Sequence, residues 1–291
     1  MTKILDGKII AGKITEEIKE KVTDFIKKTG IKPCLAVILA GNNPASRVYV
    51  DRKKKACAKA GMDSQEYLFP EGCKEEDLLK TIEELNKNEK IHGILVQLPL
   101  PPHISEEKII EAVNPLKDVD CLHPVNTGKL FSENPVVFPC TPYGIYIMLR
   151  ESGIEVTGKH AVIIGRSKIV GKPMADILLR KEIGATVTVC HSKTKNLEHH
   201  TLQADIIIAA IGKPEFVKAS MVKEGAVVVD VGINRLPESN TKSGTKLVGD
   251  VAFEEVSKKA SAITPVPGGV GPMTIAMLLR NTISAAEKIV S

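Results

Sequence analysis

The clearest indication of the fold is the segment AVIIGRSKIVGKPMADILL, residues 161–179. An apolar segment leads straight into Gly165, and Gly171 precedes a segment with helical apolar spacing. A strand, a glycine turn and a helix in this order are typical of a dinucleotide-binding domain, because the helix N-terminus offers free N–H groups to a pyrophosphate. The pattern departs from G-x-G-x-x-G, since Ser167 holds the middle position and the last glycine comes one residue late. Taken alone it is weak evidence, because such turns also occur without a ligand.

The sequence around this turn has the pattern of a Rossmann-type domain. Four apolar segments are predicted strands: residues 160–164, 186–190, 205–210 and 226–231. Separated by helix-like or turn-like sequence, they predict a parallel sheet. A short helix is predicted over residues 142–151, an exposed loop over 237–245, and a final helix over 274–290, after a turn rich in glycine and proline.

Residues 33–99 form an earlier segment of alternating strands and helices. Three apolar runs are predicted strands: residues 34–39, 65–69 and 93–98. Two charge-rich amphipathic segments, residues 46–60 and 75–88, are predicted helices between them. This alternation indicates βαβ units, and the pattern restarts near Cys140. The chain is therefore predicted to be an α/β protein of two domains.

Size and composition narrow the class of protein. The 291 residues, 43% of them apolar, can bury a substantial core. No apolar run is long enough for a membrane span and no signal-peptide pattern is present, so a cytoplasmic protein is predicted. The six cysteines lack metal-ligand spacing, so we expect reduced core thiols and no metal site. A net charge of +5 with only four Tyr and six Phe argues against nucleic-acid binding and fits small anionic ligands.

The residues after the second strand of the Rossmann-type domain indicate which dinucleotide it binds. An NAD-specific fold usually has an Asp or Glu there for the ribose hydroxyls, but this chain continues His191-Ser192-Lys193. Together with Arg166, Ser192 and Lys193 could surround a ribose 2′-phosphate, which Arg recognises by forked hydrogen bonds. NADP is thus favoured over NAD. The alternative is a solvated loop whose basic residues bind nothing.

A possible proton-transfer group lies near the start of the first predicted helix. Tyr49 and Lys53 are four residues apart and would share a helix face. An enclosed lysine can have its pKa lowered enough to exchange protons near neutral pH. Taken alone, the run from Arg52 to Lys55 is more often a solvated basic face.

Polar residues at strand ends support a site near this lysine. Gln97 ends an otherwise apolar strand, and the carboxyl ends of parallel strands face the ligand crevice. Its alternative role is to cap a loop. Asp120 could accept hydrogen bonds from a heterocycle, whereas ordinary turn chemistry is the preferred interpretation of Asp118. The glycines between prolines in residues 265–274 (PVPGGVGPMT) give a stiff loop against which a planar ligand could pack.

These motifs, in this order, resemble the bifunctional methylenetetrahydrofolate dehydrogenase/cyclohydrolases almost from end to end. The resemblance rests on the following segments: LDGK at 5–8, Ser46 with YVDRK at 49–53, VQLPLP at 96–101, KDVD at 117–120, HPVN at 123–126, GRSKIVGKP at 165–173, DVGIN at 230–234, and residues 265–274. It implies two α/β domains: a catalytic, folate-binding domain of residues 1–140, completed by the C-terminal helix 272–291, and a Rossmann NADP-binding domain of residues 141–271. It also implies a homodimer joined through the Rossmann domains.

The resemblance further implies an activity and a set of site residues. The expected reaction oxidises 5,10-methylenetetrahydrofolate with NADP and hydrolyses the methenyl product to 10-formyltetrahydrofolate. The catalytic residues implied are Lys53, Gln97, Tyr49 and Asp120. The cofactor-binding residues implied are Gly165, Arg166, Ser167, Ser192 and Ile233. The substrate-binding residues implied are Tyr49, Lys53, Val96, Gln97, Leu98, Asp120, Pro267, Gly268 and Gly269.

The sequence departs from the family after Asp120, where Cys121 and Leu122 replace the usual glycine and aromatic residue. A side chain there could shift the loop if the position needs a positive φ, and Cys121 is a candidate for a reactive thiol near the site. Three alternatives are an NAD-linked dehydrogenase without hydrolase activity, a catalytically silent folate-binding protein, and a shikimate-type or amino-acid dehydrogenase. The lack of an acid after Val189 and the presence of Lys53 argue against the first, and Lys53, Gln97 and Asp120 together argue against the second. The last does not explain residues 96–101 or 265–274.

Overall fold

The computed structural model describes residues 2–238 and 244–290, which form two compact units. One, called here the three-stranded unit, comprises Gly12–Cys140 and the residues from Ile275 to the C-terminal end. The other, the six-stranded unit, comprises the residues up to Ala11 and Thr141–Thr274. Both contain a parallel β-sheet with helices, which confirms the predicted α/β class and two-domain organisation.

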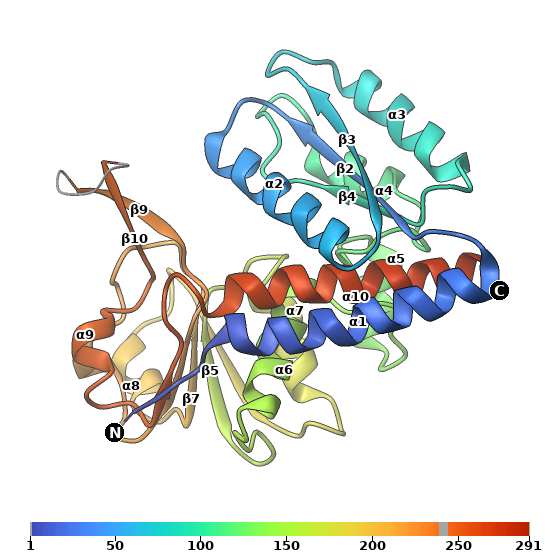
Figure 1. Ribbon diagram of the computed structural model, residues 1–291. Helices are drawn as coiled ribbons and strands as arrows, with labels where there is room; N and C mark the ends of the chain where they lie inside the picture. Colours follow the sequence, from blue (N-terminus) through green and yellow to red (C-terminus); the bar gives the residue numbers. More distant parts are fainter. Residues whose placement is uncertain (1, 239–243, 291) are drawn as a thin grey trace. The chain divides into compact units, whose positions relative to one another are not determined.

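The three-stranded unit is built on a parallel sheet in the order β3-β2-β4. Its strands are β2 (Cys34–Ala40), β3 (Asp63–Phe69) and β4 (Gly93–Val96). Every residue of β2 is buried, as expected for a central parallel strand covered on both faces. Figure 1 shows α2 (Pro44–Lys59) and α3 (Glu75–Lys87) on opposite sides of the strands. Leu78, Ile82 and Leu85 form the buried stripe of α3.

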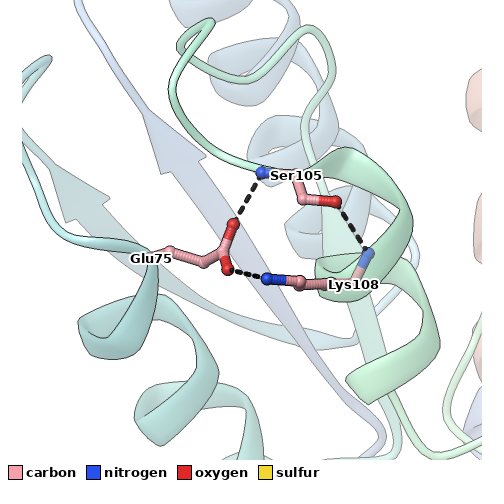
Figure 2. Close-up of polar contacts among 3 residues, drawn as sticks. All are labelled: Glu75, Ser105 and Lys108. Carbon is pink, nitrogen blue, oxygen red and sulfur yellow. Dashed lines mark hydrogen bonds and ion pairs between the residues drawn. The ribbon is translucent and has the colours of Figure 1, made fainter.

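A hydrogen-bonded cluster fixes the segment that follows β4 to the start of α3 (Figure 2). The Glu75 carboxylate accepts hydrogen bonds from the backbone N–H of Ser105 at 2.7 Å and from Lys108 Nζ at 3.0 Å. The Ser105 hydroxyl in turn accepts the Lys108 N–H, and so caps α4 (Glu106–Ala112). The α4 end of the loop between β4 and α4 is thereby tied to the start of α3. Helix α5 (Pro124–Phe131) follows α4 along the chain.

Two long helices begin in the six-stranded unit and continue in the other: α1 (Gly7–Thr29) and α10 (Val270–Val290). Within the three-stranded unit they lie side by side (Figure 1), with Lys21 Nζ 2.8 Å from Glu287 Oε2. No helix was predicted over α1, although Ile18, Val22 and Phe25 have helical spacing and are buried. The last helix starts four residues earlier than predicted, because the glycines and Pro272 of its first turn read as part of the preceding loop.

The six-stranded unit contains a parallel sheet in the order β1-β11-β8-β7-β5-β6. Its strands are β1 (Lys3–Ile4), β5 (His160–Ile164), β6 (Thr186–Cys190), β7 (Ile206–Ala209), β8 (Val227–Asp230) and β11 (Ala262–Ile263). The predicted boundary placed the first residues in the other domain. The structure places residues 2–11 here instead, because β1 pairs with β11 and Leu5 N donates to Ile263 O at 2.8 Å.

Short helices and an antiparallel strand pair complete the described part of this unit. The helices are α6 (Cys140–Glu151), α7 (Gly171–Leu179), α8 (Leu197–Thr201), α9 (Phe253–Val256) and the 3₁₀ turn η1 (Ala219–Met221). The predicted exposed loop at 237–245 is flanked by an antiparallel pair, β9 (Asn234–Pro237) and β10 (Thr245–Val248). Its first and last residues, Pro237 and Thr245, pair with each other, while 239–243 lie outside the described residues. Within residues 2–238 and 244–290, every helix is too short or too polar to span a lipid bilayer.

Candidate active site

Lys53 lies on the buried face of α2, together with Val50 and Cys57. Its side chain lies on α2, one turn after Tyr49, and is 8% exposed, whereas Arg52, Lys54 and Lys55 are exposed. Its Nζ donates a hydrogen bond of 2.9 Å to Oε1 of Gln97. The structure therefore brings together two residues that the sequence placed on separate elements. The solvated interpretation of this basic run holds for the neighbours of Lys53 but not for Lys53 itself.

The backbone and amide of Gln97 are both held in place at the end of β4. Its N–H donates to Ile38 O on the neighbouring strand at 2.9 Å, and its Nε2 donates to Leu98 O at 2.8 Å. With the amide nitrogen engaged, Oε1 is the atom that faces Lys53. Gln97 thus orients the Lys53 side-chain nitrogen without placing a negative charge beside it. Val96 is buried beside it, and Leu98 is partly exposed.

The surroundings of Lys53 make its ammonium more acidic than that of a free lysine. Burial lowers the pKa of the Lys53 ammonium, and the nearby Asp120 carboxylate and the Cys140 and Cys57 thiols only partly oppose this effect. Asp120 is half-buried and also raises the pKa of the fully enclosed Cys140 thiol, after the larger effect of burial. A lysine with a lowered pKa can exchange protons close to neutral pH. The proximity of Cys140 to Lys53 had no signal in the sequence, where it read as one of six core thiols.

Asp118 has a structural role, as preferred from the sequence. Its carboxylate is 7% exposed and accepts hydrogen bonds from Leu122 N, His123 N and Asn126 Nδ2 at 3.2, 2.9 and 2.8 Å. Burial raises the pKa of this carboxyl despite these hydrogen bonds. Asp118 therefore fixes the loop that carries Asp120.

Cys121 occupies a position with left-handed backbone geometry. Its φ is 59°, so a side chain stands where glycine has a conformational advantage. The side chain is 1% exposed, and Sγ donates to Val137 O at 3.3 Å. The idea of a reactive thiol at this position is not supported, because the sulfur is enclosed and engaged.

The glycine turn after β5 is shaped by backbone packing. Gly165 has a φ of 128°, and a Cβ there would clash with the carbonyl oxygen of Ala210. A Cβ on Gly171 would clash with the carbonyl of Gly165. Ser167 fills the middle position of the motif, and its Oγ accepts the N–H groups of Val170 and Gly171 at 3.1 and 3.4 Å. The departure from three glycines thus replaces one of them by a hydroxyl that holds the first turn of α7.

Two adjacent loops present basic and hydroxyl groups at the carboxyl edge of this sheet. The N–H of Gly165 donates to Cys190 O at 2.9 Å, which joins the loops after β5 and β6. Arg166 and Ser167 are exposed on one loop, and Ser192 and Lys193 on the other. Strand β5 lies between β6 and β7, the point where the strand order reverses and α/β sheets bind ligands. A cationic, hydroxyl-rich donor set without an acid fits a dinucleotide that carries a 2′-phosphate.

Two further predicted stretches belong to the six-stranded unit. Ile233 follows β8 and is 46% exposed. In the turn before α10, Gly268 has a φ of 118° and its oxygen accepts the Lys8 N–H at 3.2 Å, while Gly269 N donates to Pro265 O at 2.9 Å. Pro267 is exposed in the same turn. These residues are in a different unit from Lys53, Gln97 and Asp120, so the structure describes two groups of predicted site residues, each within its own unit.

The fold and the two groups of residues define a dehydrogenase-type nucleotide domain joined to an α/β domain with a buried lysine, and sequence comparison gives the family. Residues 5–120 match the catalytic domain of tetrahydrofolate dehydrogenase/cyclohydrolase, and residues 139–290 match its NAD(P)-binding domain. The chain belongs to the tetrahydrofolate dehydrogenase/cyclohydrolase family.

Similar proteins cover the chain almost completely. The bifunctional protein FolD of Acetivibrio thermocellus is 58% identical over 98% of this chain and 97% of its own length. The crystal structure of the bifunctional FolD of Campylobacter jejuni is 54% identical, with a TM-score of 0.92 and 99% of both chains covered. The Trypanosoma brucei FolD, complexed with NADP cofactor and an inhibitor, is 39% identical with a TM-score of 0.94, and covers 99% of this chain and 98% of its own.

Proposed function

We infer that this chain is a bifunctional methylenetetrahydrofolate dehydrogenase/cyclohydrolase of one-carbon metabolism. It oxidises 5,10-methylenetetrahydrofolate to the methenyl species with NADP, and then hydrolyses that species to 10-formyltetrahydrofolate. The observation that carries the hydrolase half is the buried Lys53, with a lowered pKa and a hydrogen bond to Gln97. The family supplies the substrate class and the dehydrogenase half.

In the proposed hydrolysis, Lys53 manages the protons. Water forms a bond to the methenyl carbon and loses a proton to the neutral Lys53 amine. The hydroxyl of this adduct then loses its proton as the formyl C=O forms, and the bond from that carbon to one ring nitrogen breaks as the nitrogen takes up a proton from the Lys53 ammonium. Gln97 holds the Lys53 nitrogen in place, and burial keeps its pKa low. We assign Tyr49 to orienting the folate and Asp120 to anchoring its pterin. Val96, Leu98, Pro267, Gly268 and Gly269 are assigned to the folate-binding surface.

In the proposed oxidation, this chain mainly supplies binding and orientation. When bound, NADP accepts a hydride from the methylene bridge. Gly165 lets the pyrophosphate approach the backbone, and Ser167 holds the first turn of α7 beside it. Arg166 and Ser192 bind the 2′-phosphate, and Ile233 contacts the dinucleotide from the loop after β8. We assign folate binding and catalysis to the first predicted domain and NADP binding to the second. In this assignment residues 2–11 belong to the NADP-binding domain.

We also propose that the enzyme is a homodimer joined through the six-stranded unit. Strand β6 is an edge strand, and Val189 on it is 37% exposed. Leu179 and Leu202 of the same unit are 57% and 42% exposed. An open strand edge with exposed apolar side chains favours pairing with a second copy. Light scattering after gel filtration should give twice the chain mass, and Val189→Lys should shift it toward the monomer.

A cytoplasmic location is proposed from the cysteines. All six are buried thiols, which is the usual state of cysteines in a reducing compartment. Labelling of the thiols in freshly lysed cells, with and without a reductant, tests this directly. Equal labelling after denaturation would agree with the proposal, and an increase with reductant would contradict it.

The test of the proposed function is the absorbance of purified enzyme with 5,10-methylenetetrahydrofolate and either NADP or NAD. NADPH formation with little methenyl accumulation is the expected result. Accumulation of the methenyl species would contradict the hydrolase half. Reduction of NAD in preference to NADP would favour the NAD-linked alternative, and no reduced cofactor of either kind would favour a silent folate-binding protein.

A further inference from the structure

Two buried aspartates meet near the carboxyl edge of the six-stranded sheet. Asp230 is the last residue of β8, and Asp250 lies two residues after β10. They are 3% and 0% exposed. In the part of the chain that the structure describes, no lysine, arginine or histidine side chain is hydrogen-bonded to either carboxylate. All of their hydrogen-bond partners are N–H donors of nearby loops.

Asp250 connects the loop after β7 to the loop after β8. Its Oδ2 accepts the backbone N–H groups of Ile211 at 2.6 Å and Gly212 at 2.8 Å, which follow β7. Its Oδ1 accepts from Asn234 Nδ2 at 2.9 Å, and Asn234 follows Ile233. Each carboxylate oxygen of Asp250 faces at least one N–H group, so both oxygens must be able to accept a hydrogen bond.

Asp230 holds the turn that carries Asp250. Its Oδ1 accepts the N–H groups of Gly232 at 2.9 Å and Asp250 at 2.8 Å, and its Oδ2 accepts that of Val251 at 2.9 Å. Its own N–H donates to Oγ1 of the buried Thr264 at 2.7 Å. The two aspartates therefore form one network in which each carboxylate accepts three N–H groups.

Two glycines make this network sterically possible. A Cβ on Gly232 would clash with the Asp250 carboxylate, and a Cβ on Gly249 would clash with the Asp230 carboxylate. Neither glycine has a positive φ. Gly232, near Asp230, therefore leaves space for the Asp250 carboxylate, and Gly249, next to Asp250, leaves space for the Asp230 carboxylate.

We propose that the Asp230–Asp250 pair is a positioning device that holds the loops after β7 and β8 in the conformation that binds the dinucleotide. Ligands of parallel α/β sheets bind at the carboxyl ends of the strands, where both loops lie. Fixing the loops before the ligand arrives removes an ordering cost from binding. This inference rests on the proposed dehydrogenase function, and it concerns residues that act through the backbone rather than on the reactants.

Asp250→Asn tests the pair directly. The amide offers one acceptor in place of two, so an NH₂ group must face an N–H donor of one loop. The KM for NADP should rise at least about tenfold, while the rate of methenyl hydrolysis measured without NADP stays within about twofold. Asp230→Asn should act in the same direction. The matched control is Glu254→Gln, an exposed acid four residues away, which should change neither activity.

A merely structural role would lower both activities together. A variant with an unchanged KM for NADP and normal hydrolysis would overturn the proposal. The proposed function fails differently, because the wild-type enzyme itself would then form no NADPH.

Hydrogen exchange of the wild-type enzyme provides a test that needs no variant. The amides of Ile211, Gly212 and Gly232 donate to the pair, so peptides that contain them should be protected without NADP, with little further protection on binding. Rapid exchange of these amides in the free enzyme, slowed only when NADP is added, would overturn the proposal even if both aspartate variants failed to fold.

Discussion

The Lys53 Nζ lies 2.9 Å from Oε1 of Gln97, and this hydrogen bond links the one buried cation of the run Arg52–Lys55 to a neutral acceptor. An amide can hold an ammonium in place without the electrostatic stabilisation that a carboxylate would provide. Because burial outweighs the effect of Asp120, the pKa of Lys53 remains below its usual value. The pair is therefore suited to proton exchange rather than to a permanent ion pair.

Replacing Lys53 by Met should abolish hydrolysis without destabilising the protein. Met fills a similar volume and removes the cost of burying a charge, so the free energy of unfolding at pH 7 should equal the wild-type value or exceed it by about 1 kcal/mol. The amount by which the free energy of unfolding of the wild type falls below that of Lys53→Met should shrink as pH rises toward 10.5. A lysine with a lowered folded-state pKa contributes stability that is present above its unfolded pKa and lost as pH falls through the folded pKa.

Thermal melts at several pH values and methenyl hydrolysis rates check this expectation. Lys55→Met is the control, since Lys55 is exposed on the same helix and should leave hydrolysis unchanged. Wild-type hydrolysis in Lys53→Met would rule out Lys53 as the proton-transfer group.

Gln97→Glu should shift the pH dependence of hydrolysis to higher pH. A carboxylate at the position of Oε1 favours the protonated amine and raises the pKa of Lys53. The neutral amine would then appear only at a higher pH, by about one unit or more for a partner at hydrogen-bond distance. Hydrolysis rates from pH 6 to 10 measure the shift, with Gln203→Glu as the exposed control. An unchanged profile with a normal rate would show that the Gln97 contact does not tune Lys53.

Gly165→Ala should remove dehydrogenase activity and lower stability. The added Cβ meets the Ala210 carbonyl oxygen, and the φ of 128° is unfavourable for alanine, so a cost of about 2 kcal/mol or more is expected. NADPH formation and melting temperature are the measurements. Gly12→Ala on α1 is the matched control, because a Cβ there meets no atom within 4 Å, and it should be neutral or slightly stabilising. A Gly165→Ala enzyme with normal NADP use would show that the turn can relax.

Comparing glycine with alanine at Cys121 tests backbone strain, because both variants lose the same thiol group. At a φ of 59°, Cys121→Gly should be more stable than Cys121→Ala by about 1 kcal/mol. At Cys57, which lies within α2, the order should reverse, since glycine is less favourable than alanine in a helix by about 1 kcal/mol. Denaturant unfolding of the four variants measures both differences. The same order at both positions would mean that strain at Cys121 is negligible.

Local patterns in the sequence determined most of the fold and the candidate residues. The apolar runs at residues 34–39 and 160–164 became buried parallel strands, because a strand covered on both faces must be apolar throughout. The glycine turn and the absence of an acid after Cys190 depend on chemical identity alone. They indicate the nucleotide-binding class and the preference for a 2′-phosphate without reference to long-range contacts.

Which polar residues are buried, and which groups they face, depends on how distant parts of the chain pack together. Lys53 and Lys55 look alike in the sequence, but packing encloses one and leaves the other in water. The pairing of β1 with β11, the position of Cys140 beside Lys53, and the meeting of Asp230 with Asp250 join residues far apart along the chain. Such contacts follow from how whole elements pack, so no local spacing can reveal them, whereas strands, helices and turns follow from local periodicity and backbone preference.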